Sequence, residues 1–424
     1  METERLYAED VEVAAEIIRS GGVVGIPTET VYGLGVDAMN EQAVERLYEA
    51  KHRPLVKPIN VLVTGMGMAE TLCAEIPPVA YTLAGQFWPG PLTMIFRDNG
   101  RVARMVLAGG ETLGVRCPDH PLTLALLEAV GRPLATPSAN LSGEPSPKNA
   151  GAVLESLNGW IDAVVDGGPC TVGVESTIVD FTKEVPAILR EGGLSVRVMR
   201  RAMGGMKLDT ANMRSVRPIH IFGVTGGTGC GKTTALRVME ELNIRVIDCD
   251  EVYHQMLASG GELCEALRVR FGAELFDRDG QLDRKSLGRM VFADSAALEE
   301  LNGITHRHIS LEVNRRIGQA VQDGCAAVAV DAIALLEGGF GRQCDATIGI
   351  LAPQALRAAR IMARENLSEE YALSRVMAQK PDSYYRDNCD FILENNGDLG
   401  QFQLAVRRLI NGLLEDCRGE IGTN

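Results

Sequence analysis

The sequence has few of the residues that build metal sites and membrane spans. It contains only 6 histidines, and its 10 cysteines include no C-x-x-C pair. The one close histidine pair, His306-Arg307-His308, has no cysteine cluster beside it, so we interpret it as structural or substrate-facing rather than as a zinc site. No apolar run approaches the roughly 18–20 residues of a membrane span, and the N-terminal METERLYAED does not resemble a signal peptide. We therefore expect reduced thiols, a cytoplasmic location and no membrane partner.

An excess of positive charge is also lacking, because the formal net charge is −14. Proteins that bind the phosphate backbone of nucleic acids usually present net positive charge, so direct nucleic-acid binding is not expected. Basic residues around position 207 could form a local nucleic-acid patch, although we favour a solvated linker of mixed charge. These residues are Arg200, Arg201, Lys207, Arg214 and Arg217.

At 424 residues the chain is too long for one ordinary core. We predict a first domain over residues 1–203, a linker over 204–217 and a second domain over 218–424. Strand-like runs alternate with helical patterns, which is typical of α/β domains. In the first half the predicted strands are Val23–Ile26, Ile59–Val63, Leu92–Phe96, Ala163–Val165 and Thr177–Asp180. One predicted helix is capped by Asn40 and runs through Ala50, and another covers Pro121–Val130.

The second half contains a phosphate-binding loop, IFGVTGGTGCGKTT, over Ile221–Thr234. Its apolar strand turns into a run that fits G-x-x-x-x-G-K-[ST] at every fixed position. The predicted ATP-binding residues are Gly226, Gly227, Thr228, Gly229, Cys230, Gly231, Lys232, Thr233 and Thr234. Small residues let consecutive backbone N–H groups face phosphate oxygens, and the following helix adds its positive N-terminus. Lys232 is expected to reach the outer phosphates and the Thr233 hydroxyl to hold Mg²⁺. A simple glycine-rich turn is the less favoured interpretation.

Further charged residues of the second half follow predicted strands or share a helix face. Asp248 and Asp250 come after the strand Arg245–Ile247, where carboxylates can meet Mg²⁺ or a nucleophilic hydroxyl, although a turn-stabilising role for Asp248 is equally favoured. Asp331 closes another strand, Ala326–Val330. In the predicted helix Ala355–Glu365, three arginines lie broadly on one face; an exposed salt-bridged helix or a phosphate-closing lid would explain them. They are Arg357, Arg360 and Arg364.

Polar residues of the first half collect at turns beside strands, where sites tend to lie. The basic ones offer contacts for phosphates, and the hydroxyl and amide groups offer orientation, with no evident Ser/His/Asp set. Taken singly, each residue also fits a solvated basic turn, an ST-turn or a helix start. They are Lys51, Arg53, Lys57, Arg116, Ser138, Asn140, Ser176 and Arg190.

The motifs PTETVYGLG, KHRPLVKP, FWPGPLT, GVRCPDHP, PSANLSG and GVESTIVD resemble the threonylcarbamoyl-AMP synthase (YrdC-like) family, in its order, over nearly all of residues 5–200. The resemblance implies a twisted mixed-sheet α/β domain and a nucleotidyltransferase that makes L-threonylcarbamoyladenylate and pyrophosphate from L-threonine, bicarbonate or CO2, and ATP. The product would pass to the machinery that modifies tRNA beside the anticodon. The family's K-x-R and S-x-N elements map onto Lys51, Arg53, Ser138 and Asn140.

This resemblance gives the remaining candidates their expected roles. Lys51, Arg53, Lys57 and Arg190 would bind the triphosphate, and Thr30 and Tyr32 would shape the threonine pocket. Arg116 would pair with the amino-acid carboxylate or with a phosphate, and Ser138, Asn140 and Ser176 would fix the nucleotide.

The motifs TGGTGCGKTT, VIDCDEVYHQML, FDRDGQLDRKSLGRMVF, LNGITH, VDAIALLE and LENNG are similar to dephospho-CoA kinase over about 218–415. This resemblance implies a P-loop kinase with a parallel sheet and a helical lid, which phosphorylates the 3′-hydroxyl of dephospho-CoA with MgATP. Asp250 would be the base or orienter, Lys232 would hold the β- and γ-phosphates, Arg360 and Arg364 would hold the transferring group, and Asn395 would lie near the adenine.

Two departures from the kinase pattern put the acceptor in question. His254 stands where the family has arginine, and Ile333-Ala334 replace Pro-Leu; a histidine cannot reproduce the two-pronged grip of arginine. The prediction is a bifunctional enzyme. The alternatives for the second domain are a kinase for another small nucleotide-like acceptor or a non-catalytic regulatory module, and for the first domain an RNA-binding module.

Overall fold

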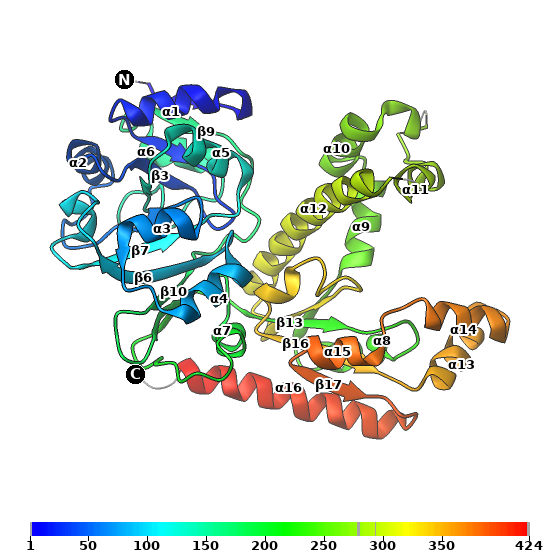
Figure 1. Cartoon of the computed structure of the whole chain (residues 1–424). Coiled ribbons are helices and arrows are strands. Elements are labelled where there is room, and N and C mark those ends of the chain that lie inside the picture. The colour runs from blue at the N-terminus through cyan, green and yellow to red at the C-terminus, as the bar shows by residue number, and fades with distance from the viewer. Residues whose placement is uncertain (1, 278–279, 293, 422–424) are drawn as a thin grey trace. The chain divides into compact units, whose positions relative to one another are not determined.

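The computed structural model describes residues 2–277, 280–292 and 294–421. It divides into two compact units, Met1–Arg217 and Pro218–Asn424 (Figure 1). Part of the segment predicted as a linker belongs to the first sheet, since β12 (Arg214–Ser215) pairs in parallel with β11 (Ala187–Glu191). In the part of the chain that is described, no helix is both long and apolar enough to cross a membrane.

The first unit is built on one mixed sheet with the strand order β1-β9-β2-β3-β8-β4-β7-β6-β10-β11-β12, to which β5 adds a side pairing with β6. The sheet contains both parallel pairs, such as β10–β6, and antiparallel pairs, such as β6–β7. The other strands are β1 (Glu4–Leu6), β2 (Val24–Ile26), β3 (Gly33–Asp37), β4 (Val61–Leu62), β5 (Cys73–Ala74), β6 (Leu92–Asp98), β7 (Thr112–Arg116), β8 (Leu134–Ala135), β9 (Ala163–Val165) and β10 (Thr177–Asp180).

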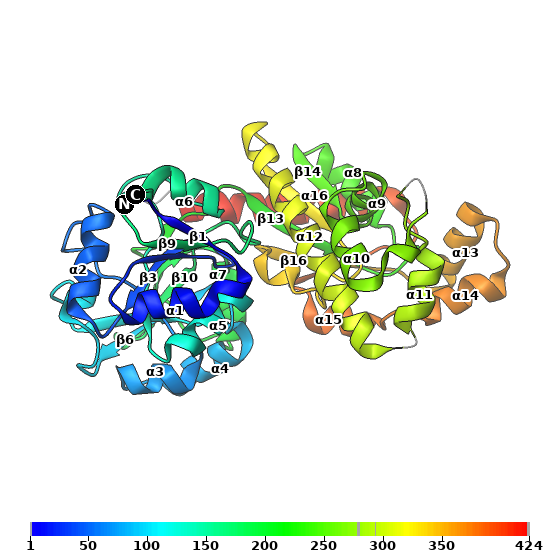
Figure 2. The same ribbon diagram turned by 90° about the horizontal axis from the view of Figure 1, so that it is seen from above.

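Helices cover this sheet and bury its apolar side chains. They are α1 (Val11–Arg19), α2 (Glu41–Ala50), α3 (Met66–Leu72), α4 (Pro78–Phe87), α5 (Pro121–Val130), α6 (Ala150–Leu157) and α7 (Val196–Ala202), with 3-10 turns at Ala8–Asp10 and Arg104–Leu107. The Asn40 side chain caps α2 by accepting the backbone N–H groups of Gln42 and Ala43, as the sequence predicted. Helices α1 and α5 pack together through Ile18 and Leu127 (Figure 2).

The second unit is built on a five-stranded sheet, all parallel, in the order β14-β15-β13-β16-β17. Its strands are β13 (His220–Thr225), β14 (Ile244–Asp248), β15 (Ala327–Asp331), β16 (Ala346–Leu351) and β17 (Phe391–Glu394). The predicted fold class is therefore confirmed: a mixed-sheet α/β unit precedes a parallel-sheet α/β unit.

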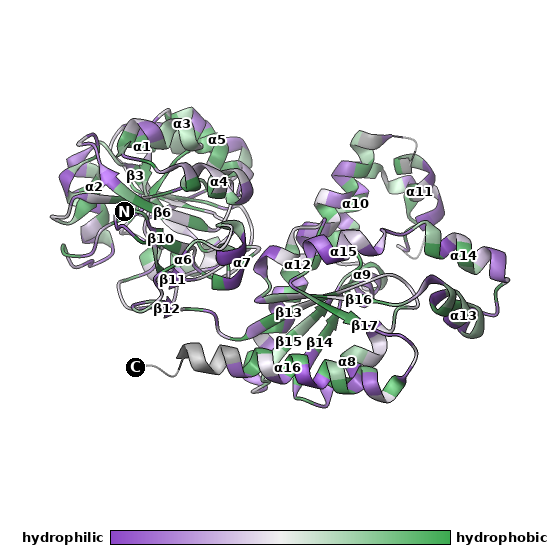
Figure 3. Cartoon of the chain, turned by 60° about the horizontal axis from the view of Figure 1, so that its bottom comes forward, coloured by the Kyte–Doolittle hydropathy of each residue, from purple (hydrophilic) through white to green (hydrophobic). Residues whose placement is uncertain are grey.

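Successive side chains of strands β13 and β15 are buried on opposite faces of this sheet. Phe222 and Ala329 join the core under α8 (Lys232–Glu240) and α16 (Leu399–Ile421), whereas Val328 and Val330 join the core under α9 (Cys249–Ala258) and α12 (Ser295–Gln322). Figure 3 shows these strands as almost continuously hydrophobic, as expected for a parallel sheet covered on both sides.

Two groups of helices have small cores of their own. Helices α13 (Gln354–Glu365) and α14 (Glu369–Met377) pack through Ala358, Ile361, Ala372 and Val376 (Figure 1). Helices α10 (Glu262–Phe271) and α11 (Arg284–Phe292) pack beside α12 (Figure 2). The remaining elements are α15 (Asp382–Asn388) and 3-10 turns at Ala273–Leu275 and Phe340–Gln343.

Candidate active sites

A cavity of about 180 Å³ lies among loops and strands of the first unit. It brings together predicted residues from segments far apart in the chain, and the predicted residues that line it are Thr30, Arg53, Arg116, Ser138, Ser176 and Arg190. Tyr32, Lys51, Lys57 and Asn140 lie outside the residues that line it. The lining also includes Thr28, Asn60, Thr93, Thr136 and Glu175, which were not among the predicted site residues.

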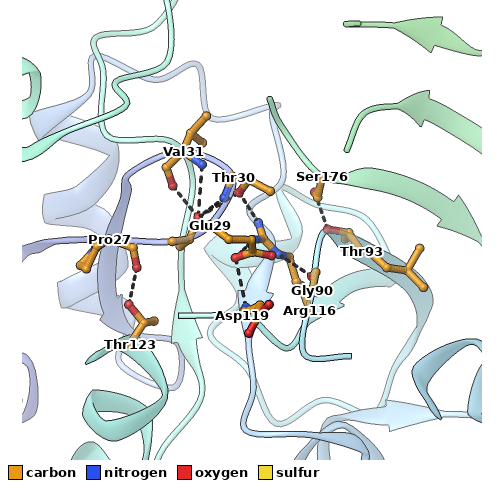
Figure 4. A network of polar contacts seen from close by, with 12 residues as sticks. Pro27, Glu29, Thr30, Val31, Gly90, Thr93, Arg116, Asp119, Thr123 and Ser176 are labelled. Carbon is orange, nitrogen blue, oxygen red and sulfur yellow. Dashed lines mark hydrogen bonds and ion pairs between the residues drawn. The ribbon is translucent and has the colours of Figure 1, made fainter. Parts of the chain in front are cut away.

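The wall around Arg116, at the end of β7, is a buried polar network (Figure 4). Arg116 Nη2 forms an ion pair with Glu29 Oε2 at 2.6 Å, and Arg116 Nη1 donates to Thr30 Oγ1 at 2.8 Å. The Thr30 hydroxyl also lies 2.9 Å from the Thr28 hydroxyl. Thr28 Oγ1 accepts the backbone N–H of Thr30 at 3.2 Å and of Val31 at 3.2 Å, forming the ST-turn that fixes this loop. Glu29 was missed because a carboxylate in PTET has no local feature that marks its distant partner.

A second part of the wall centres on Ser176. Its hydroxyl lies 2.8 Å from Thr93 Oγ1 and accepts Arg190 Nη2 at 3.1 Å, while its carbonyl oxygen accepts Arg190 Nε at 2.8 Å. Burial lowers the pKa of Arg190 to about 10, so the guanidinium still carries its charge near neutral pH. This part of the cavity therefore offers hydroxyl groups beside one fixed cation.

Lys51 lies behind Ser138 rather than in the cavity. Its side chain is 1% exposed, and its ammonium donates to the carbonyl oxygens of Ser138 and Asn140. Asn140 Nδ2 donates in turn to the carbonyls of Leu141 at 2.9 Å and Glu144 at 2.6 Å. Burial, followed by the nearby charge of Arg53, lowers the pKa of Lys51 to about 7. In this structure both residues fix the loop that presents Ser138.

Arg53 faces the cavity with its guanidinium held by backbone carbonyls. Its Nε donates to the Lys57 carbonyl at 3.1 Å and its Nη2 to the Pro58 carbonyl at 2.7 Å. The Lys57 side chain is exposed. Tyr32 is fully buried, and its hydroxyl donates to the Gly168 carbonyl at 2.8 Å and accepts the Gly167 N–H at 3.1 Å. Tyr32 thus holds the neighbouring loop at Gly167-Gly168 and does not line the cavity.

In the second unit, the P-loop joins β13 to α8, whose first residue is Lys232. Gly226, Gly229 and Gly231 have φ values of 144°, 81° and 105°, which favour glycine. A Cβ on Gly231 would lie 2.2 Å from Asn395 Nδ2. Lys232 Nζ donates to the Gly226 carbonyl at 2.9 Å. The loop therefore has the strand–turn–helix geometry that presents backbone N–H groups and a lysine to phosphates.

Carboxylates end β15, which pairs with the P-loop strand β13, and β14, which pairs with β15 on its other side. Asp248 and Asp331 are paired across β14 and β15. Asp248 Oδ1 caps α9 by accepting the N–H groups of Asp250 at 2.8 Å and Glu251 at 3.1 Å, which is the turn-stabilising role weighed for it. Burial raises the pKa of Asp331 to about 6 against the opposing attraction of Lys232, and its Oδ1 is buried without a hydrogen-bond partner among the described atoms.

A second cavity of about 220 Å³ opens beside Asp250. Its lining is mainly apolar, with Tyr253, His306, Ile333 and Ala334 among the residues. His306 therefore faces a cavity, as one of the two interpretations of the histidine pair predicted. His254 is exposed and lies outside this lining, with its Nδ1 2.7 Å from the Asp250 carbonyl oxygen. Of the two departures from the kinase pattern, His254 therefore lies outside the cavity lining, whereas Ile333-Ala334 forms part of it.

The arginines of α13 have different positions. Arg357 is buried and donates from Nε to the Thr228 carbonyl at 3.0 Å. Arg360 Nη1 donates to the Gly229 carbonyl at 3.0 Å, and its Nη2 to Asn395 Oδ1 at 3.0 Å. Arg364 is exposed and pairs with Glu365. Two of the three arginines therefore contact the P-loop or its support, and the third faces solvent.

Asn395 connects this contact to the P-loop. It is 4% exposed and its Nδ2 donates to the Cys230 carbonyl at 2.9 Å. Cys230 itself is buried, which raises the pKa of its thiol. Gln379 was not predicted from the sequence, yet it hydrogen-bonds Thr228 through both its carbonyl and its amide group.

Two family models match the chain, one in each unit. The model described as "Telomere recombination", which groups the Sua5, YciO and YrdC proteins, matches residues 16–192. The model described as "Dephospho-CoA kinase" matches residues 220–401.

Curated relatives divide in the same way. The threonylcarbamoyl-AMP synthase of Pyrococcus abyssi (strain GE5 / Orsay) is 43% identical over 208 residues, which cover 49% of this chain and 61% of that protein. A Mycobacterium tuberculosis (strain H37Rv) protein bearing the same family name is 36% identical over 47% of this chain and 90% of its own length. The dephospho-CoA kinase of Latilactobacillus sakei subsp. sakei (strain 23K) is 34% identical over 46% of this chain and 96% of that protein.

Fold and sites together define an α/β protein with two separate polar sites, the second of which is a P-loop site. The chain belongs to the threonylcarbamoyl-AMP synthase family through its first unit and to the dephospho-CoA kinase family through its second. It spans 61% of the length of the Pyrococcus relative.

Proposed function

We propose that the chain is a bifunctional enzyme. Its first unit makes L-threonylcarbamoyladenylate and pyrophosphate from L-threonine, bicarbonate or CO2, and ATP, and its second phosphorylates the 3′-hydroxyl of dephospho-CoA with MgATP. The synthase proposal rests on the gathering of Arg53, Arg116, Ser138, Ser176 and Arg190 around one cavity. The kinase proposal rests on the P-loop geometry and on the Asp250 carboxylate in the lining of the second cavity.

In the synthase site L-threonine and bicarbonate or CO2 give a carbamate on the amino group of threonine. An oxygen of this carbamate attacks the α-phosphate of ATP, and pyrophosphate leaves. Because both reactants are anionic, catalysis consists mainly of orientation and charge stabilisation. Arg53 and Arg190 supply cations for the triphosphate, Ser138 and Ser176 orient the nucleotide, and Arg116 with Thr30 receives the amino acid. Lys51 and Asn140 hold the loop of Ser138, Tyr32 holds a neighbouring loop, and the exposed Lys57 adds charge near the entrance.

In the kinase site the acceptor hydroxyl attacks the γ-phosphate of ATP, the bond to the bridging oxygen breaks, and ADP leaves. Asp250 lines the acceptor cavity and would orient that hydroxyl or accept its proton. Lys232 would hold the β- and γ-phosphates, and the P-loop residues through Thr234 would hold the remaining oxygens. Arg360 and Arg364 would stabilise the transferring group, and Asn395 would support the nucleotide side of the loop.

The donor set fits Mg²⁺. Asp331 Oδ1 is a buried carboxylate oxygen without a partner among the described atoms, and Thr233 is the second residue of the helix after the P-loop; hard oxygen donors of this kind suit the ion. When bound, Mg²⁺ would neutralise phosphate charge. Thr233 would contribute its hydroxyl oxygen, and Asp331 would contribute a carboxylate oxygen near the ion.

We further propose that the adenylate product passes to tRNA-modifying transferase machinery and that the enzyme works in the cytoplasm. Cys73, Cys117 and Cys170 are buried free thiols, which suits a reducing compartment.

Two assays on the purified full-length chain test these proposals. Threonine-dependent pyrophosphate release should be lost in Arg53→Ala, and coenzyme A formation should be lost in Lys232→Ala, with each variant keeping the other activity. A chain that binds ATP but makes no coenzyme A would overturn the kinase proposal and favour another acceptor or a regulatory P-loop module.

A further inference from the structure

Glu29 lies behind the cavity of the first unit and reaches it through Arg116 (Figure 4). The ion pair between Arg116 Nη2 and Glu29 Oε2 measures 2.6 Å, and the two side chains are 8% and 4% exposed. Arg116 lines the cavity, whereas Glu29 lies outside the lining residues. Glu29 is therefore placed to act on a ligand through Arg116 and not by direct contact.

The network fixes the guanidinium plane of Arg116 from three sides. Besides the ion pair, Arg116 Nε donates to the Gly90 carbonyl at 3.2 Å and Nη1 donates to Thr30 Oγ1 at 2.8 Å. Glu29 Oε2 also accepts the Asp119 backbone N–H at 3.1 Å. Glu29 thus ties its own loop to the segment that follows β7, so the position of its carboxylate determines how Arg116 meets the cavity.

The same pair distributes charge within the site. The carboxylate of Glu29 compensates the buried charge of Arg116, which would otherwise be costly to bury. Arg53 and Arg190, which also line the cavity, form no ion pair within 4.0 Å among the described residues, and the Glu175 carboxylate of the same lining attracts Arg190 without a close ion pair. A polyphosphate is favoured near cations that are not closely paired with a carboxylate, whereas a single carboxylate on a zwitterion needs oriented donors and little net charge.

We propose that Glu29 is a positioning residue for the amino-acid half of the site, where it holds Arg116 against the carboxylate of L-threonine and leaves the triphosphate to Arg53 and Arg190. The inference rests on the proposed synthase function and decides between the two partners considered for Arg116. It makes Glu29 a determinant of threonine affinity and not of ATP affinity.

Two substitutions separate the contributions of Glu29. In Glu29→Gln, the amide oxygen can replace Oε2 and the NH2 group can take the place of Oε1, which has no hydrogen-bond partner among the described atoms; this variant keeps the shape and removes the charge. Glu29→Ala removes both. Asp37→Asn is the matched control, because Asp37 is a 1% exposed carboxylate that pairs with Arg132 at 2.7 Å and accepts the Met39 N–H at 2.9 Å, outside the cavity lining.

The experiment measures L-threonine binding by calorimetry, the KM values for threonine and ATP in pyrophosphate release, and the melting temperature, all on the full chain. Displacing a substrate-orienting guanidinium should raise the threonine KM and Kd about 10- to 100-fold in Glu29→Ala, and by a smaller factor in Glu29→Gln, with the ATP KM within about twofold. Asp37→Asn should leave both KM values within about twofold, even if it lowers the melting temperature as much.

A double-mutant cycle with Arg116→Gln distinguishes a positioning role of Glu29 from a merely structural one. The quantity measured is the coupling between the two substitutions in threonine binding. If Glu29 acts through Arg116, the Glu29→Gln effect on threonine binding disappears in the Arg116→Gln background. Equal increases in the threonine and ATP KM values, or full additivity in the cycle, would overturn the inference. If Glu29→Ala and Glu29→Gln do not fold, Glu29→Asp replaces them in the experiment. It keeps the negative charge but moves the carboxylate away from Arg116, so the same changes in KM and Kd are expected. A wild-type chain that does not bind threonine would overturn the proposed synthase function itself, whereas threonine binding that survives in every Glu29 variant would overturn this inference alone.

Discussion

Gln379 makes two hydrogen bonds to Thr228 of the P-loop: its Oε1 accepts the Thr228 backbone N–H at 2.8 Å, and its Nε2 donates to Thr228 Oγ1 at 2.8 Å. The same Oε1 accepts Nη2 of Arg357. One amide group therefore joins the segment after α14 and the first arginine of α13 to the phosphate-binding loop.

We expect Gln379→Ala to loosen the P-loop before nucleotide binds. Losing two hydrogen bonds of about 0.5–1 kcal/mol each should raise the ATP KM for coenzyme A formation about 5- to 30-fold. The threonine-dependent activity of the same chain provides an internal control and should not change. An unaltered ATP KM would show that the loop holds its shape without Gln379.

Asp331 is predicted to favour catalysis at the expense of stability. Burial raises its pKa in the folded chain to about 6, above the ordinary aspartate value of 3.8, so between these values the folded chain binds more protons than the unfolded chain. Its contribution to the unfolding free energy therefore falls as the pH rises through this window and stays lost above it.

Asp331→Asn should accordingly stabilise the chain at pH 7 by at most about 3 kcal/mol, and this gain should vanish as the pH approaches 4. The same variant should lose most of its coenzyme A formation. Denaturant unfolding of both proteins at several pH values, together with the kinase assay, measures both effects. A variant that is less stable than wild type at pH 7 would contradict the role assigned to burial.

Arg360 and Arg364 should differ in kinetic effect because only Arg360 contacts the P-loop backbone and Asn395. We expect Arg360→Lys to raise the ATP KM and lower kcat, each about tenfold or more, because lysine cannot reproduce the forked contacts.

Arg364→Ala should instead lower kcat with little change in the ATP KM, because the exposed Arg364 can reach the phosphates only after α13 moves. Steady-state kinetics of the two variants side by side measures the difference. Equal effects on the ATP KM would indicate that both side chains bind the nucleotide before closure.

Signals contained within one segment predicted much of the fold. The strand Thr177–Asp180, the helix Pro121–Val130 and the Asn40 cap coincide with the structure, because apolar periodicity and capping act over a few residues. The P-loop was equally readable, since its glycine positions and lysine form one contiguous pattern.

Contacts between segments far apart in the sequence could not be predicted from such local patterns. Gln379 lies 151 positions from Thr228, and nothing in its neighbours marks it as a P-loop partner. Glu29 lies within the motif PTETVYGLG, yet its burial beside Arg116 depends on how β7 passes the loop after β2. Lys51 was recognised as a site residue, but its position behind Ser138 depends on the packing of the whole sheet.

The most direct test of the bifunctional account is mass-spectrometric analysis of products from one preparation of the full-length chain. The chain would be incubated with L-threonine, bicarbonate, MgATP and dephospho-CoA, beside the Lys232→Ala and Arg53→Ala variants. We predict both threonylcarbamoyl-adenylate and coenzyme A from the wild type, only the adenylate from Lys232→Ala, and only coenzyme A from Arg53→Ala. A wild-type chain that yields only one of the two products, with both variants folded, would contradict the account.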